Sequence, residues 1–246
     1  MKRLNWQILL GLSLIALSAF FYLVHYAIYR DARHIFIYLL GDIAFVPVQV
    51  LLVTLIIDRF LSEREKRSML KKLNMVIGAF FSEVGTRLLK SFCDFDIHAD
   101  TIRKDLIVDK EWSAKDFSRA LKHLKRHDYS VSSKKGNLED LKEFLIGKRD
   151  FLLGLLENPN LLEHESFTEL LWAVFHLTEE LAFREDVKRL VDTDYDHISG
   201  DMQRAYIVLI SEWLLYMKHL KNDYPYLFSL SIRMNPFDPS ASPEVR

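Results

Sequence analysis

The sequence predicts an all-α membrane protein with an N-terminal transmembrane helical hairpin, a long stalk helix and a cytoplasmic helical bundle. Three observations lead to this prediction. Hydrophobic residues make up 50% of the 246 residues, and the chain has only 8 glycines and 6 prolines, which leaves little room for turn-rich β architecture. In addition, the longest apolar runs lie in the first quarter of the chain, and most of the charged residues follow them.

Residues 1–60 are predicted to form the hairpin, with helices at about residues 6–29 and 35–57. From Ile8 to Tyr29 the first helix contains no Asp, Glu, Lys or Arg, and at about 1.5 Å per residue it is long enough to cross a hydrocarbon core about 30 Å thick. A cleaved signal peptide is the alternative for this run. However, the run is longer than a signal segment and does not end in small residues, so we expect a retained membrane helix.

Basic residues next to the two helices predict the orientation. Lys2 and Arg3 precede the first helix, and many more basic residues follow the second, at positions Arg59, Arg64, Lys66, Arg67, Lys71 and Lys72. The positive-inside rule therefore places both termini in the cytoplasm. We expect a multi-pass protein of the inner (cytoplasmic) membrane, surrounded by the lipid bilayer, with about three quarters of the chain on the cytoplasmic side.

Polar residues inside the two apolar helices fall on two stripes, which together we call the membrane seam. Ser18 and His25 share one face of the first helix, and Asp42 and Gln49 share one face of the second. An ionised carboxylate is expensive in lipid, so Asp42 should face a polar group, another subunit or water. The seam either lines an ion path in an oligomer or packs the helices as a polar clasp, and the clasp is favoured.

Residues 61–92 are predicted to form a stalk helix that continues the second membrane helix. No proline occurs between Pro47 and Pro159, and Gly78 and Gly85 are tolerated weak points. Apolar residues recur at helical spacing along one face of this segment, at positions Leu70, Leu73, Val76, Ile77, Phe80, Val84 and Leu88.

Residues 93–234 are predicted to form one cytoplasmic helical bundle, followed by an extended tail at residues 235–246. Helical periodicity predicts segments near residues 99–108, 113–127, 138–157, 166–184, 197–222 and 226–234. Ser113, Asn137 and Ser166 are the predicted N-caps. Breaks are expected at residues 130–136, 158–159, 192–196 and 224–225. The apolar faces suffice for the core of a single bundle.

A basic stretch lies within this region and is the predicted contact surface for an anionic partner. We call it the basic face, and its members are Lys115, Arg119, Lys122, Lys125 and Arg126. It could bind lipid headgroups, an acidic protein partner or nucleic acid. A solvated surface that neutralises the acidic residues of the same bundle is the favoured alternative. Nucleic acid is not expected as a partner.

The sequence predicts no catalytic residue, no metal and no cofactor. Neither a Gly-x-Ser-x-Gly elbow nor a P-loop is present. The nearest approaches to a metal-ligand set are His176 with Glu179 and Glu180, the region around His197, and His219, and we expect none of them to hold an ion.

The one cysteine, Cys93, excludes an intrachain disulfide framework. It lies beside Asp94 and Asp96, whose charges should raise the pKa of its thiol, so it is not a predicted nucleophile.

Two regions of the chain resemble a group of uncharacterised prokaryotic membrane proteins. They are residues 41–50 (Gly-Asp-Ile-Ala-Phe-Val-Pro-Val-Gln-Val) through 74–85, and residues 212–220 (Glu-Trp-Leu-Leu-Tyr-Met-Lys-His-Leu) through 224–230 with Asn-Pro-Phe at 235–237. The resemblance covers nearly the whole chain and implies two membrane helices followed by a helical cytoplasmic part. It implies no activity, cofactor or catalytic residue.

These observations predict a non-enzymatic inner-membrane protein with a cytoplasmic helical domain that binds a protein partner or senses a signal. We expect it to be a homo-oligomer, since the residues of the membrane seam find few polar groups to contact within a single hairpin. The alternative is a homo-oligomeric ion channel or transporter in which Asp42 and Gln49 line the path.

Overall fold

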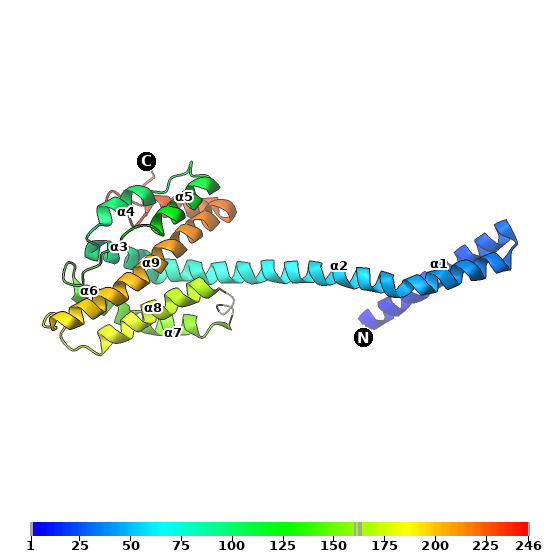
Figure 1. Ribbon diagram of the computed structural model, residues 1–246, viewed down its shortest axis with the longest axis horizontal. Coiled ribbons are helices and arrows are strands. Elements are labelled where there is room, and N and C mark those ends of the chain that lie inside the picture. The colour runs from blue at the N-terminus through cyan, green and yellow to red at the C-terminus, as the bar shows by residue number, and fades with distance from the viewer. Residues whose placement is uncertain (1, 160, 162–163, 246) are drawn as a thin grey trace. The chain divides into compact units, whose positions relative to one another are not determined.

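The computed structural model describes residues 2–159, 161 and 164–245, and the all-α prediction is confirmed for these residues. Apart from one isolated bridge between Asp96 and Val131, no β-structure occurs in this described part of the chain. The helices are α1 (Lys2–Tyr29), α2 (Ala32–Phe80), the π-helix η1 (Phe81–Gly85), α3 (Thr86–Phe95), α4 (Ala99–Leu106), α5 (Ala114–Leu124), α6 (Leu138–Gly147), α7 (Arg149–Leu156), α8 (Glu165–Ala182), α9 (Asp192–Asp223) and α10 (Pro225–Arg233) (Figure 1).

The chain divides into two compact units, and the boundary falls within α2. Residues 1–66 form the first, which we call the hairpin unit, and residues 67–246 form the second, which we call the helical domain. By length and composition alone, α1 from Ile8 to Tyr29 and the apolar run that begins at Ile35 could each cross a membrane, and no residue of their most apolar stretches is buried inside the structure.

The hairpin unit turns between its two helices within two residues. Arg30 adopts a φ of 50°, a left-handed conformation that few residues other than glycine take up, and its N–H donates to the carbonyl oxygen of Tyr26 at 2.8 Å. The Asp31 carboxylate then accepts from the backbone N–H of Arg33 at 2.9 Å, at the start of α2. These contacts end α1 and begin α2.

The core of the helical domain surrounds α8 and α9, which pack side by side (Figure 1). Buried apolar residues recur at helical spacing on both helices, among them Leu170, Leu171, Val174, Leu177 and Leu181 on α8 and Ala205, Leu209, Leu214 and Met217 on α9. Helices α3, α5 and α10 also pack against α9, and α6 and α7 pack against α8. Each helix buries one apolar stripe in this shared core.

The segment predicted as a stalk is interrupted and contributes to this core. From Leu73 onward, the face predicted from helical spacing is buried in the helical domain. The continuous helix gives way to η1 after Phe80, and Phe80 at the end of α2 and Phe81 at the start of η1 are both buried. An ideal Cβ at Gly85 would lie 2.5 Å from Cδ1 of Phe81, so the wide turn requires glycine at this position.

Two of the three predicted N-caps are confirmed. Ser113 and Asp116 form a reciprocal capping box at α5, and the side chain of Asn137 accepts from the N–H of Asp140 at α6. The prediction for Ser166 is wrong, because α8 begins earlier and His164 caps it by accepting from the N–H of Phe167 at 3.2 Å.

The break predicted at residues 192–196 is wrong, because α9 already begins at Asp192. Three aspartates there suggest a polar loop, but carboxylates in a first helical turn are stabilised by the helix dipole. Asp192 also pairs with Lys134 at 2.7 Å, and Asp194 pairs with Arg184 at 2.9 Å. Conversely, the predicted helix at 138–157 is divided into α6 and α7 at Lys148.

Residues 234–245, which follow α10, contain no helix, but they are not separate from the bundle. Phe237 is fully buried, with its ring centroid 5.1 Å from that of Trp213. Asn235 is also buried, and its side chain donates to the carbonyl oxygen of Leu106 at 2.8 Å. The sequence pattern favoured an extended tail because Pro, Ser and Asp surround these two residues.

Candidate functional site

Three members of the membrane seam meet at one pocket of the hairpin unit. Ser18 and His25 from α1 and Asp42 from α2 line a cavity of about 440 Å³, together with Phe21, Tyr22, Ile35 and Tyr38. Gln49 is exposed and does not line this cavity. The arrangement places a carboxylate, an imidazole and hydroxyl groups around one space that is otherwise apolar. Such groups can hold a proton or a cation, or bond to one another.

The basic face is exposed on α5 and just beyond its end. Phe117, Ala120 and Leu124 point into the core, and the five basic side chains lie outside it. Lys115, Arg119 and Lys122 line an open cavity of about 480 Å³ with Ala114 and Ser118. Only one of the five has a carboxylate partner in the described residues, since Arg119 lies 3.2 Å from Asp116. The face therefore keeps most of its positive charge available to a partner.

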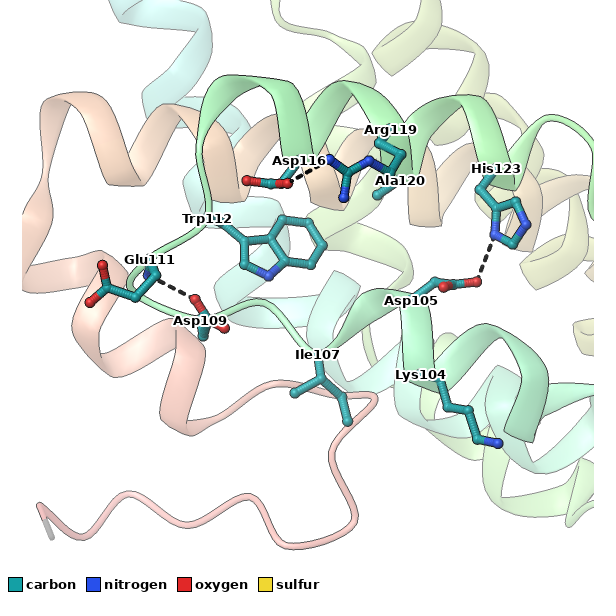
Figure 2. Close-up of a pocket in the computed structure, with 10 residues that line it drawn as sticks. All are labelled: Lys104, Asp105, Ile107, Asp109, Glu111, Trp112, Asp116, Arg119, Ala120 and His123. Atoms are coloured by element: carbon teal, nitrogen blue, oxygen red, sulfur yellow. Dashed lines mark hydrogen bonds and ion pairs between the residues drawn. The ribbon is translucent and has the colours of Figure 1, made fainter.

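A second cavity, of about 520 Å³, lies between α4, α5 and the segment that joins them, and it was not predicted (Figure 2). It shares Arg119 with the cavity of the basic face. Trp112 forms one wall, and Arg119 lies 3.2 Å from Asp116. His123 Nδ1 lies 2.7 Å from Asp105 Oδ2, and the Asp109 carboxylate accepts from the N–H of Glu111 at 2.7 Å. Asp105, Asp109 and Asp116 thus each have a partner within the cavity lining, and we assign the cavity no ligand.

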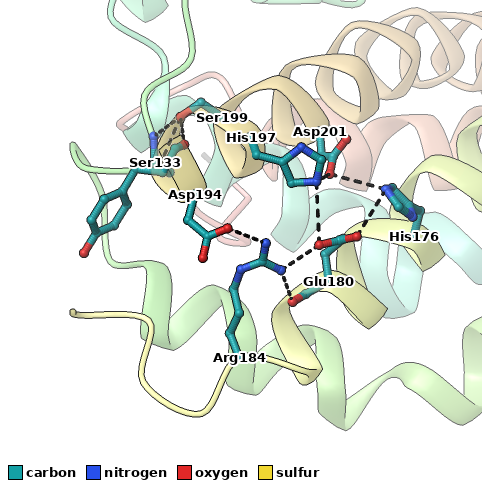
Figure 3. Close-up of polar contacts among 9 residues, drawn as sticks. Ser133, His176, Glu180, Arg184, Asp194, His197, Ser199 and Asp201 are labelled. Carbon is teal, nitrogen blue, oxygen red and sulfur yellow. Dashed lines mark hydrogen bonds and ion pairs between the residues drawn. The ribbon is translucent and has the colours of Figure 1, made fainter. Parts of the chain in front are cut away.

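Two histidines and two carboxylates converge between α8 and α9, and we call them the α8–α9 cluster (Figure 3). His176 and Glu180 come from α8, and His197 and Asp201 come from α9. Asp201 Oδ2 lies 3.4 Å from Nε2 of His176 and 3.4 Å from Nε2 of His197. Glu180 Oε1 lies 3.9 Å from Nε2 of His176, and Glu180 Oε2 lies 3.6 Å from Nε2 of His197.

Two arginines contact the carboxylates of this cluster. Arg184 Nη1 lies 2.6 Å from Glu180 Oε2, and the other guanidinium nitrogen lies 2.9 Å from Asp194. The hydrogen bond that Arg184 donates to Glu180 holds the pKa of the Glu180 carboxyl below its usual range, so this side chain is ionised at neutral pH. Arg204 lies 3.3 Å from Asp201 Oδ1.

The other predicted metal candidates lie apart from the cluster. Glu179 pairs with Arg149 at 2.7 Å. His219 lies 2.8 Å from Asp223 and 3.3 Å from the side chain of Asn74. Of the residues considered from the sequence, the structure brings together His176, Glu180 and His197. Sequence reasoning missed Asp201, although its spacing of four residues from His197 matches the spacing of His176 and Glu180 and could have identified it.

Cys93 is buried, with its sulfur 3.5 Å from the hydroxyl oxygen of Tyr206. Its thiol pKa is raised, as predicted from the sequence. The main cause is different, however, because burial of the thiol contributes more than the charges of Asp96 and Asp94.

Comparison with known proteins gives consistent matches to one family. Residues 2–61 match a family model described as the N-terminal helical domain of MJ1433, and residues 69–233 match the C-terminal helical domain of uncharacterized protein MJ1433. The chain is 46% identical over 238 residues to the uncharacterized protein MJ1433 of Methanocaldococcus jannaschii, with 97% of this chain and 96% of that protein covered. No solved structure matches the chain.

Proposed function

The chain belongs to the MJ1433 family, whose N-terminal and C-terminal helical domains it carries in order, and we propose that it is a non-enzymatic, membrane-anchored binding protein. The hairpin unit inserts in the inner membrane with both termini in the cytoplasm. The helical domain lies in the cytoplasm and uses the basic face to bind an acidic protein partner.

The observation that carries membrane insertion is the exposure of the apolar side chains of the hairpin unit. The most apolar stretches of α1 and α2 have no buried residue, and Leu9, Ile15, Leu23 and Leu40 are each about two-thirds exposed. By contrast, most of the described leucines and phenylalanines of the helical domain are buried. Soluble monomers rarely expose so continuous an apolar surface, and a lipid bilayer removes it from water.

Alkaline extraction of membranes from cells that express the full chain tests this part of the proposal. The wild-type protein should stay in the membrane pellet. A variant with Leu17→Arg and Leu52→Arg should shift towards the soluble fraction, because an arginine near the middle of a membrane helix costs about 3 kcal/mol on insertion. Phe183→Arg, at an exposed apolar position of the helical domain, is the matched control and should stay in the pellet. Release of the wild-type protein by carbonate would contradict insertion.

Partner binding is supported by the uncompensated charge of the basic face. Cross-linking in the native host should yield a defined adduct with wild type and lose it when Lys115 and Lys122 are both changed to Glu. Lys188→Glu is the control, since Lys188 already pairs with Glu139 outside the basic face. An adduct pattern that is the same in wild type and in the double variant would remove the basic face from the proposal.

A second function is favoured by the pocket that Ser18, His25 and Asp42 line: a homo-oligomeric ion channel or transporter. In this case Asp42→Asn should change cation or proton flux into liposomes and leave assembly intact. Gln49→Ala, outside the pocket, should have a smaller effect. Equal flux with wild type, with Asp42→Asn and with empty liposomes would exclude this second function.

A further inference from the structure

The α8–α9 cluster contains four metal-binding side chains, held by two packed helices. Each helix contributes a histidine and a carboxylate spaced by four residues, which places both on the same helix face. One ligand atom from each of His176, Glu180 and His197 lies within 4.8 Å of the others. Asp201 from α9 lies 3.4 Å from both imidazoles and is the fourth ligand that we propose. We propose that this cluster binds one divalent transition-metal ion and that zinc fits it best.

The distances between ligand atoms match a tetrahedral site. Ligands bound about 2.0–2.1 Å from a tetrahedral zinc ion lie about 3.3–3.4 Å from one another. In the cluster, Asp201 Oδ2 is 3.4 Å from both imidazole Nε2 atoms. Glu180 lies 3.9 Å from Nε2 of His176 through Oε1 and 3.6 Å from Nε2 of His197 through Oε2, so its carboxylate must rotate to turn one oxygen towards both imidazoles. Imidazole and carboxylate are both ligands that zinc prefers.

The buried oxygen of Asp201 points to a cation independently of these distances. The residue is only 3% exposed, and Oδ2 makes no hydrogen bond to any described residue, although two imidazole nitrogens lie 3.4 Å away. Burial of a carboxylate oxygen without a hydrogen bond is costly unless a cation contacts it, and Arg204 contacts only the other oxygen, Oδ1. A metal ion between Asp201 and the two imidazoles would provide that charge.

The two arginines contact oxygens that leave the centre of the cluster open. Arg204 contacts Asp201 Oδ1, so Oδ2 faces the histidines, and Arg184 contacts Glu180 Oε2, so Oε1 is free to face His176. Such contacts orient ligating carboxylates in metal sites. The site therefore offers two carboxylates and two imidazoles, a ligand set that a zinc ion accepts.

Zinc binding to the full chain in detergent, with any affinity tag removed and bound metal stripped by a chelator, tests the proposal. Titration with zinc chloride should show one ion per chain, and zinc should raise the melting temperature of the wild-type protein. His176→Ala and His197→Ala should each weaken binding by at least 10-fold. Glu179→Gln and His219→Ala are the controls outside the cluster and should bind zinc as the wild type does.

Asp201→Asn keeps the size of the side chain and separates a metal site from an ion-pair network with a protonated histidine. If the cluster binds metal, zinc should raise the melting temperature of wild type but not that of this variant. Cobalt bound to wild type should give the intense visible absorption of a tetrahedral ion, and the variant should lose it. Equal zinc-induced shifts in both proteins, or no stoichiometric zinc in wild type, would overturn the proposal. Neither result bears on membrane insertion.

Discussion

Replacement of Phe237 by alanine should destabilise the helical domain strongly, although only nine residues follow it in the sequence. Its ring is fully buried and packs edge-to-face on Trp213, with ring centroids 5.1 Å apart. Loss of a buried phenylalanine side chain costs about 3–5 kcal/mol. For a unit of this size each kcal/mol lowers the melting temperature by about 2–4 °C, so the expected decrease is about 6–20 °C.

Thermal unfolding of the full chain in detergent, followed by intrinsic tryptophan fluorescence, measures this decrease. Val245→Ala is the matched control, because Val245 lies in the same segment and is 83% exposed. Its change should stay within about 0.5 kcal/mol of wild type. If Phe237→Ala melts within about 2 °C of wild type, the terminal segment does not pack on the bundle in solution and the reasoning fails.

Three further predictions concern the helices of the domain, and urea unfolding checks each. Gly200→Ala should stabilise α9 by about 1 kcal/mol, because an added Cβ meets no atom within 4 Å, and an unchanged midpoint would contradict this. Gly85→Ala should destabilise the domain by about 1–3 kcal/mol, because its Cβ would meet the buried Phe81 ring at 2.5 Å, and a more stable variant would refute this close contact. The hydrogen bonds from Ser113 lower the pKa of Asp116 below its ordinary value of 3.8, so the stability they provide is full above that pH and is lost as the pH falls through the folded pKa. Asp116→Asn should therefore lower the midpoint at pH 7 and have less effect near pH 2.5, and an equal effect at both would argue against the capping box.

Most helices of the domain could be predicted because their signals are local. The capping residues Ser113 and Asn137, and Pro225 at the first position of α10, act within one helical turn of where they occur. The apolar spacing of the last turns of α2 likewise predicted a buried face, although not which helices cover it.

The features that sequence reasoning missed depend on contacts between distant segments. Asp201 acquires its role only because α8 and α9 pack together, which brings it to His176 on the other helix. Phe237 is buried through Trp213, and the start of α9 is stabilised by Lys134 from an earlier loop. A pattern within one segment contains no information about such pairings.

The burial of Cys93 makes this protein suitable for site-specific labelling. Cys93 is the only cysteine of the chain, and its raised pKa and its exposure of 2% leave little thiolate within reach of a maleimide in the folded protein. A cysteine introduced at an exposed position should therefore react selectively without removal of the native one. When the domain unfolds, Cys93 becomes reactive, so its rate of modification reports how often the core opens.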